Sequence, residues 1–226
     1  MKRVFLVATF LMFAALLEAQ NKQKWEEKLN DVHNVLEEMN KLPESQVPAA
    51  IMNEAEAIMI IPRVIKGGLL VGGRHGKGVA IIRSESGQWS NPVFVNITGG
   101  SIGWQIGAQS TDIILVFKRS DKLKYFEKSE FTLGADAAIA AGPVGRQVGA
   151  GTDITFEAEV YSYSRSRGIF AGISLEGSSI QLNEKANETF YEQSSVPQKI
   201  YFNRKFDRLP GIPKIKKQLL LMEQEQ

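Results

Sequence analysis

Basic side chains gather in two stretches of this sequence, where they could bind anions. Five lysines and arginines, with no acid, lie between Arg63 and Arg83. Seven more lie between Gln198 and Lys217, where Asp207 is the single acid. Such clusters attract acidic lipid head groups by about 1 kcal/mol per basic residue near a membrane surface, whereas a solvated basic face without a ligand is the alternative. The residues expected to bind an anionic head group are Lys66, Arg74, Lys77, Lys199, Arg204, Lys205, Arg208, Lys214, Lys216 and Lys217.

The segment Gly72–Gly78 lies within the first stretch and resembles a phosphate-binding loop. A Walker loop needs four residues between its glycines, and its lysine is followed by Ser or Thr. Here three residues separate Gly72 from Gly76, and Gly78 follows Lys77. Nucleotide hydrolysis is therefore not supported. We predict instead a β-hairpin tip whose backbone N–H groups could bind an anion.

Ser101 lies in a G-x-S-x-G pattern, which is typical of a hydrolase nucleophile. Such a serine opens a helix and precedes its histidine, but an apparent strand follows here, and His33 and His75 both come earlier. We therefore expect no catalytic serine.

Carboxylates could supply the pair that glycoside hydrolysis requires, but sequence spacing does not establish their separation, and an exposed strand face is the alternative. The candidates are Asp136, Asp153, Glu157 and Glu159. The chain of 226 residues has no cysteine and two histidines, which excludes thiol nucleophiles, disulfides and Cys-ligated metals. We expect no metal, no cofactor and no enzymatic turnover, and we keep a carboxylate-dependent envelope enzyme as the remaining catalytic hypothesis.

Composition and the first residues indicate an exported globular protein. Apolar residues make up 43% of the chain and charged residues 23%, and the formal net charge is +2. Lys2 and Arg3 precede an apolar run that is shorter than the ~20 residues of a spanning helix. This pattern predicts a signal peptide with cleavage after Ala19, and an uncleaved anchor is the alternative.

Glycine placement predicts a β-rich centre with helical flanks. Nineteen of the 20 glycines fall between Gly67 and Gly177, and glycine weakens helices and marks turns and bulges. The strands expected from apolar runs are Ala57–Ile61, Leu69–Val71, Val79–Arg83, Pro92–Ile97, Asp112–Lys118, Ile154–Ser164 and Ile169–Leu175. We predict an α+β fold with an antiparallel core, curled or barrel-like, flanked by amphipathic helices; a sandwich is the alternative.

Apolar spacing indicates helices on both sides of this centre. In the helix expected over 21–42, apolar residues recur every three or four positions and should pack on the core, with a partner chain or a membrane as alternatives. The members of this stripe are Trp25, Leu29, Val32, Leu36 and Met39. Further helices are expected over 48–56, 181–191 and 212–222.

Two glycine-rich segments share a repeated sequence pattern. Both Gly103–Ile113 and Gly145–Ile154 follow G-x-Q-[IV]-G-A with T-D-I shortly after. Two equivalent turns entering paired strands are the plain interpretation, and a pair of loops facing one ligand is the alternative.

Five ordered motifs together resemble the SYLF lipid-binding family. They are IPRVIKGGLLVGGRHGKGVAIIR (61–83), GQWSNPVFV (87–95), GGSIGWQIGAQSTDIILV (99–116), GADAAIAAGPVGR (134–146) and YSRSRGIFAGISLEG (163–177). The resemblance implies phospholipid or phosphoinositide binding rather than enzymatic turnover, and some fungal members are described as actin-binding.

The resemblance and the residue patterns together predict the organisation of the chain. We expect a signal peptide over 1–19, an amphipathic helix over 20–42, a single SYLF-like domain over 43–222 and a polar tail over 223–226. The expected role is that of an exported periplasmic or secreted module that binds anionic phospholipid at a membrane surface. A protein-interaction scaffold is the alternative, and the export signal argues against nucleic acid as a partner.

Overall fold

The computed structural model describes residues 2–41, 46–68, 71–102, 109–118, 130–143, 158–166, 169–172, 175–193 and 195–224. Four helices of this part are α1 (Lys2–Lys41), α2 (Ala49–Asn53), α4 (Glu184–Tyr191) and α5 (Ile212–Gln224), with short 3-10 turns η3 (Pro197–Lys199) and η4 (Arg204–Phe206). The strands are β1 (Ala57–Gly68), β2 (Val71–Ile82), β3 (Val93–Ile102), β4 (Gln109–Phe117), β5 (Glu130–Thr132), β6 (Ile139–Ala141), β7 (Val160–Ser166), β8 (Ile169–Gly172) and β9 (Ser178–Leu182).

The described strands form one curled sheet with the order β5-β9-β3-β2-β1-β4-β7-β6, and β8 also pairs with β7. Every pair is antiparallel except β6 with β7. The edge strands β5 and β6 approach each other, because an isolated bridge joins Leu133 to Ala137 just beyond their facing ends. The predicted α+β fold with a curled antiparallel core is confirmed, apart from the parallel pair of β6 and β7.

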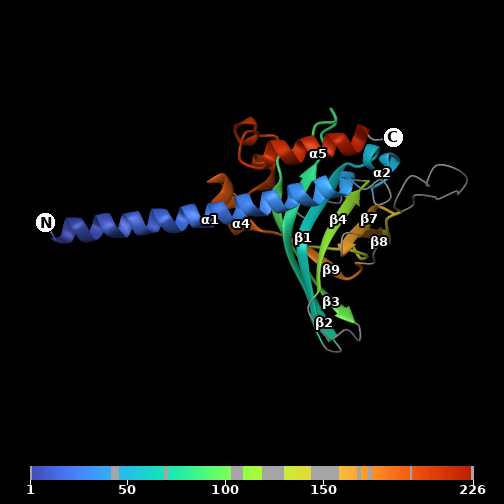
Figure 1. Cartoon of the computed structure of the whole chain (residues 1–226), viewed down its shortest axis with the longest axis horizontal. Helices are drawn as coiled ribbons and strands as arrows, with labels where there is room; N and C mark the ends of the chain where they lie inside the picture. The colour runs from blue at the N-terminus through green and yellow to red at the C-terminus, as the bar shows by residue number, and fades with distance from the viewer. Residues whose placement is uncertain are drawn as a thin grey trace, which may run out of the picture.

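Helix α1 runs without a break from Lys2 to Lys41, so the predicted signal segment and the predicted amphipathic helix form one rod. Figure 1 shows its N-terminal part extending beyond the sheet and its C-terminal part lying beside α5. Whether the first residues are removed stays a prediction. Among the residues that the structure describes, no helix combines the length and apolarity needed to cross a bilayer.

The sheet is buried on both faces, and each face has its own apolar core. On the helix face, the predicted α1 stripe packs with strand residues such as Ile58 and Ile60 and with α4 and α5. On the other face, here called the inner face, Met59, Ile61 and Phe131 belong to a second core. Successive strand residues point to opposite faces, which explains why the run at the start of β1 is apolar throughout. The stripe of α1 therefore packs on the sheet, as expected.

The segment Gly72–Gly78 lies mainly in the N-terminal half of β2, paired with β1 and β3. The prediction of a hairpin tip there is wrong, and so is the assignment of its basic residues to a loop. The glycines serve close packing instead: a Cβ on Gly78 would lie 2.1 Å from the Ile60 carbonyl oxygen, and one on Gly76 would lie 2.7 Å from Val64. Both contacts arise beside an irregularity in β1 between Ile60 and Ile65, the setting in which strand glycines are expected.

Other boundaries shift by a few residues. Strand β3 continues to Ile102, and β7 begins at Val160, while residues 154–157 lie outside the described part of the chain. The predicted strand at Leu69–Val71 also falls mostly outside it, with Val71 opening β2. The helices expected over 48–56 and 212–222 are confirmed as α2 and α5. The helix expected over 181–191 is confirmed as α4, except that residues 181–182 belong to β9.

Candidate functional site

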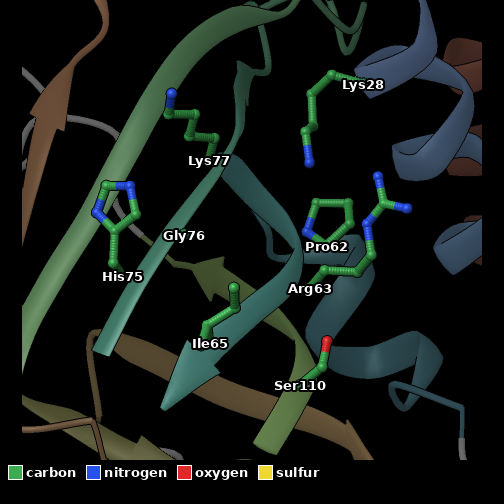
Figure 2. A pocket seen from close by; sticks show the side chains of 8 residues that line it. All are labelled: Lys28, Pro62, Arg63, Ile65, His75, Gly76, Lys77 and Ser110. Carbon is green, nitrogen blue, oxygen red and sulfur yellow. The ribbon is translucent and has the colours of Figure 1, made fainter. Parts of the chain in front are cut away.

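A basic hollow lies where α1 crosses the β1–β2 pair. Its volume is about 520 Å³, and its lining includes Lys28 from α1, Arg63 and Ile65 from β1, and His75 and Lys77 from β2. Figure 2 shows the Lys28 and Arg63 side chains pointing toward each other on one side, with the two β2 side chains on the other. Ile65 lies between them and is 56% exposed. The hollow therefore presents a solvent-facing apolar side chain surrounded by cations.

The irregularity in β1 creates this arrangement. Ile60 pairs with Val79 and Ile65 pairs with His75, so five steps along β1 correspond to four along β2. The extra residue is a β-bulge, and Arg63 within it adopts a left-handed backbone conformation with φ 54°. Because the bulge shifts the alternation of side chains by one, Ile65 joins His75 on the helix face and borders the hollow.

Ion pairs and an aromatic contact fix the cations of the hollow. Lys28 Nζ lies 3.5 Å from Asp31 Oδ2, and the Arg63 guanidinium pairs with the same carboxylate. Lys77 Nζ lies 5.7 Å from the centroid of the Trp25 ring, within the range of a cation–π interaction. Burial lowers the pKa of Lys28, an effect that Asp31 partly offsets and Arg63 adds to. Among the described residues, the cations Lys28, Arg63 and Lys77 thus share one acidic neighbour, the carboxylate that pairs with Lys28 and Arg63.

A second ion cluster holds α1 on the sheet beside the hollow. Asp112 of β4 accepts a hydrogen bond from the Arg63 backbone N–H at 2.9 Å and two from the Arg165 guanidinium at 2.9 and 2.6 Å. Arg165 also pairs with Glu38 of α1. Burial raises the pKa of Asp112, and the Arg63 N–H acts in the opposite direction. This cluster positions the bulge that carries Arg63.

The structure separates the basic residues that the sequence analysis grouped around β1 and β2. Lys77 reaches the hollow on the helix face. Lys66 and Arg74 lie directly opposite each other on β1 and β2, and alternation along β2 places Arg74 on the face opposite to Lys77. Arg74 Nη2 donates to the Gly100 carbonyl at 3.4 Å. Of these three predicted residues, Lys77 alone borders the hollow.

The C-terminal basic residues form a separate surface. Figure 1 shows α5 on one side of α1 and the free ends of β1 and β2 on the other. Phe202 is 49% exposed in this region, whereas Tyr201 and Phe206 are buried. Lys216 Nζ pairs with Asp207 at 2.9 Å. The exposed predicted cations here are Lys199, Arg204, Lys205, Arg208, Lys214 and Lys217.

Sequence reasoning missed four residues of the hollow. Arg63 was counted in the basic stretch but not assigned to a site, and His75 was considered as a partner for a catalytic serine. No pattern in the sequence marked Ile65, because its exposure depends on the bulge. Lys28 sits three positions after Trp25, on the flank of the apolar stripe, and only the crossing of α1 over β2 brings it to Lys77.

The candidate catalytic groups have structural partners where the structure describes them. Asp136 Oδ2 accepts from the Thr132 N–H at 2.6 Å, and Glu159 Oε2 accepts from the Ala138 N–H at 3.0 Å. Ser101 lies within β3, opposite Gly72. The described residues do not include Asp153, Glu157 or most of the two glycine-rich segments with the repeated pattern. The described part of the chain contains no group of three or more His, Asp or Glu placed to hold a metal ion.

Comparison with known proteins identifies relatives of this chain. Residues 98–219 match the family described as Ysc84, Las17-binding protein actin regulator. The SH3 domain-containing YSC84-like protein 1 of Xenopus laevis is 35% identical over 155 residues, 68% of this chain and 46% of the relative. The human protein of that name is 35% identical over 152 residues, 67% of this chain and 44% of the relative.

A yeast relative extends the comparison. LAS seventeen-binding protein 3 of Saccharomyces cerevisiae (strain ATCC 204508 / S288c) is 34% identical over 161 residues, 70% of this chain and 35% of the relative. This chain thus spans less than half the length of these curated relatives. It belongs to the Ysc84, or SYLF, family of Las17-binding actin regulators, which is a family of regulatory and binding domains.

Proposed function

We propose that this protein is an exported, non-enzymatic module that binds anionic phospholipid head groups at a membrane surface. The observation that carries the proposal is the basic hollow, in which Lys28, Arg63 and Lys77 surround the exposed Ile65. An acidic membrane offers both partners that such a surface needs, because phosphates can approach the cations while the apolar side chain enters the interface. Binding of this kind requires no cofactor.

The C-terminal surface supplies a second membrane contact in this proposal. Phe202 is exposed within a region rich in exposed cations, including Lys199, Arg204 and Lys205. Aromatic side chains with cationic neighbours favour the head-group region of a bilayer. The two surfaces come from different elements, and each alone would bind weakly. Together they would increase the residence time of the protein on the membrane.

Export rests on the first residues of the sequence. Lys2, Arg3 and the following apolar run favour secretion to the periplasm or the exterior. On that side of the inner membrane, anionic head groups are accessible to a peripheral protein. Detection of the cleaved chain outside the cytoplasm, with an N-terminus at position 20, would test this part separately from lipid binding.

Vesicle flotation tests the lipid proposal. The protein should bind vesicles containing phosphatidylglycerol more tightly than neutral phosphatidylcholine vesicles, and salt should weaken this binding. The double variant Lys28→Gln/Lys77→Gln should bind acidic vesicles about 30-fold more weakly, as two cations contribute about 1 kcal/mol each. Equal binding to both kinds of vesicle, unaffected by salt, contradicts the proposal.

A matched control removes two charges elsewhere. Lys41→Gln/Lys185→Gln has the same net charge as the test variant, but Lys41 lies about 20 Å along α1 from Lys28 at 1.5 Å per residue, and Lys185 lies on α4. This variant should retain most of the vesicle binding. If both double variants lose affinity equally, net charge rather than the hollow is responsible.

A protein partner is the second candidate function. It is favoured by the 34–35% identity to relatives named for Las17 binding and for SH3 domains. Co-sedimentation of the full chain with actin filaments tests it directly. Filament binding without binding to acidic vesicles would replace the lipid proposal with this one.

A further inference from the structure

A row of polar residues crosses the inner face of the sheet, on the side opposite to the basic hollow. Lys66 of β1 pairs with Arg74 of β2, Arg74 pairs with Gly99 of β3, and Gly99 pairs with Ser178 of β9. Residues directly opposite each other in antiparallel strands share a face. The row therefore brings two cations and a hydroxyl to one face.

The neighbouring row shows which face this is. It consists of the residues two positions away along each of the four strands, which are Val64, Gly76, Ile97 and Ile180. The three of these that have side chains belong to the inner core. The polar row thus begins where the inner apolar core ends. Lys66 and Arg74 remain partly exposed, whereas Ser178 is fully buried.

Two polar atoms of this row have no hydrogen-bond partner. They are Arg74 Nε and Ser178 Oγ, and both are buried from solvent. The Arg74 guanidinium makes one described hydrogen bond, from Nη2 to the Gly100 carbonyl oxygen, which directs the group over β3 toward β9. Buried donors without partners are uncommon in folded proteins, because leaving them unpaired costs free energy. Neither Lys66 nor Arg74 forms an ion pair within the described part of the chain.

Gly99 has no side chain, which lets Ser178 of β9 pack directly against it. A Cβ at Gly99 would lie 3.0 Å from Ser178 Oγ and 3.1 Å from the Ser178 Cα. With strands about 4.8 Å apart, the Cα atoms of Arg74 and Ser178 are separated by roughly 10 Å. An extended arginine covers much of that distance, so one small ligand could bridge the guanidinium and the hydroxyl.

We propose that Lys66, Arg74 and Ser178 form a binding site for a small oxyanion of the phosphate class. The unpaired groups are an N–H donor and a hydroxyl, and the two side chains beside them are cationic, so the complementary ligand carries several acceptor oxygens and a negative charge. An ordered water would satisfy the hydrogen bonds but not the charge. The site lies on the opposite face from Lys77 and does not depend on membrane binding by the hollow.

Titration calorimetry of the full chain with inorganic phosphate tests this proposal. The wild type should show saturable binding. Arg74→Gln should weaken it about 10-fold or more and Ser178→Ala several-fold, because each loses a donor to the anion. Lys185→Gln is the control, since it removes a cation from the exposed surface of α4, outside both proposed sites, and it should bind phosphate within about two-fold of the wild type.

A second arm identifies the source of the phosphate group. Vesicles of equal charge are prepared with phosphatidic acid, a phosphomonoester, or with phosphatidylglycerol, a phosphodiester. If the site takes a lipid head group, Ser178→Ala weakens binding to phosphatidic acid selectively, and free phosphate competes. If it takes a free anion, Ser178→Ala binds both vesicles as the wild type does. Either result, together with the calorimetry, supports the site.

Folding is monitored by thermal unfolding of each variant. Ser178→Ala removes a hydroxyl that has no partner, so it should fold normally, and Arg74→Lys replaces Arg74→Gln if the latter does not fold. A wild type that takes up no phosphate shows that water alone occupies this space, and the proposal is then wrong. The proposal is also wrong if Ser178→Ala and the Arg74 variant, whether Arg74→Gln or Arg74→Lys, both bind phosphate as tightly as the wild type.

Discussion

Lys77 of β2 lies over the Trp25 ring of α1, with Nζ 5.7 Å from the ring centroid. The same ring packs against Phe94, with 5.1 Å between the two ring centroids, and Trp25 is only 7% exposed. One side of this tryptophan therefore belongs to the helix-face core, while another supports a cation of the hollow. Folding and the proposed lipid contact meet at this residue.

Trp25→Ala should lower the free energy of unfolding by about 3 to 5 kcal/mol, because it leaves a cavity between α1 and Phe94. Urea denaturation of the two proteins measures the difference. Phe202→Ala is the control: its side chain is 49% exposed, and the change should stay within about 0.5 kcal/mol. Equal effects of the two substitutions would contradict the packing of α1 on the sheet.

Gly78→Ala should destabilise the protein by about 3 kcal/mol or more, because a Cβ there would lie 2.1 Å from the Ile60 carbonyl oxygen. The clash is with backbone, so a side-chain rotation cannot relieve it. Gly100→Ala is the matched substitution, since a Cβ there has no atom within 4 Å. It should fold with nearly unchanged stability. Thermal unfolding of the pair measures the contrast, and similar melting temperatures would argue against the observed register of β1 and β2.

These glycines also show where the sequence was informative and where it was not. Their crowding correctly predicted a β centre, since 19 of 20 lie between Gly67 and Gly177. It could not tell a turn from a crowded strand, because both need residues without a side chain. The choice at Gly76 and Gly78 depends on a bulge in β1, and a bulge results from pairing with a distant segment rather than from local preference.

The helices were easier to predict than the hollow. The stripe from Trp25 to Met39 repeats a local spacing, so its burial follows from one segment alone. The hollow joins Lys28 to Lys77 across 49 positions, and no local pattern contains that contact. Lys66 and Arg74 were assigned from charge alone, which does not reveal that Arg74 and Lys77 point to opposite faces of β2.

Asn187→Ala should lower the free energy of unfolding by about 2 to 3 kcal/mol. Asn187 is fully buried on α4, and its Oδ1 accepts from the Phe94 N–H at 2.8 Å. Alanine would leave that N–H buried without a partner. Glu188→Ala, on the exposed side of the same helix, should change stability by less than about 0.5 kcal/mol. Chemical denaturation distinguishes the two variants. An Asn187→Ala protein as stable as the wild type would show that this side chain does not hold α4 on β3.

Lys28→Met should stabilise the folded protein at neutral pH while weakening its binding to acidic vesicles. Burial lowers the pKa of Lys28 from its ordinary value of 10.5, so the charged form is disfavoured in the folded state relative to the unfolded state. At pH 7 the lysine is charged in both states, so its removal should raise the free energy of unfolding.

The pH dependence of this gain follows from proton counting. Between the lowered pKa and 10.5, the unfolded state binds more protons at Lys28 than the folded state, so the stability of the wild type rises with pH. The advantage of Lys28→Met should therefore shrink between pH 7 and pH 10, as measured by urea denaturation at both values. Lys185→Met, on the exposed surface of α4, should stay within about 0.5 kcal/mol of the wild type.

A Lys28→Met protein that is less stable than the wild type at pH 7 would mean that the pair with Asp31 outweighs the cost of burial. The lysine would then be explained by stability alone. A stabilised variant with weakened vesicle binding indicates instead that the charge is kept in the hollow for its ligand.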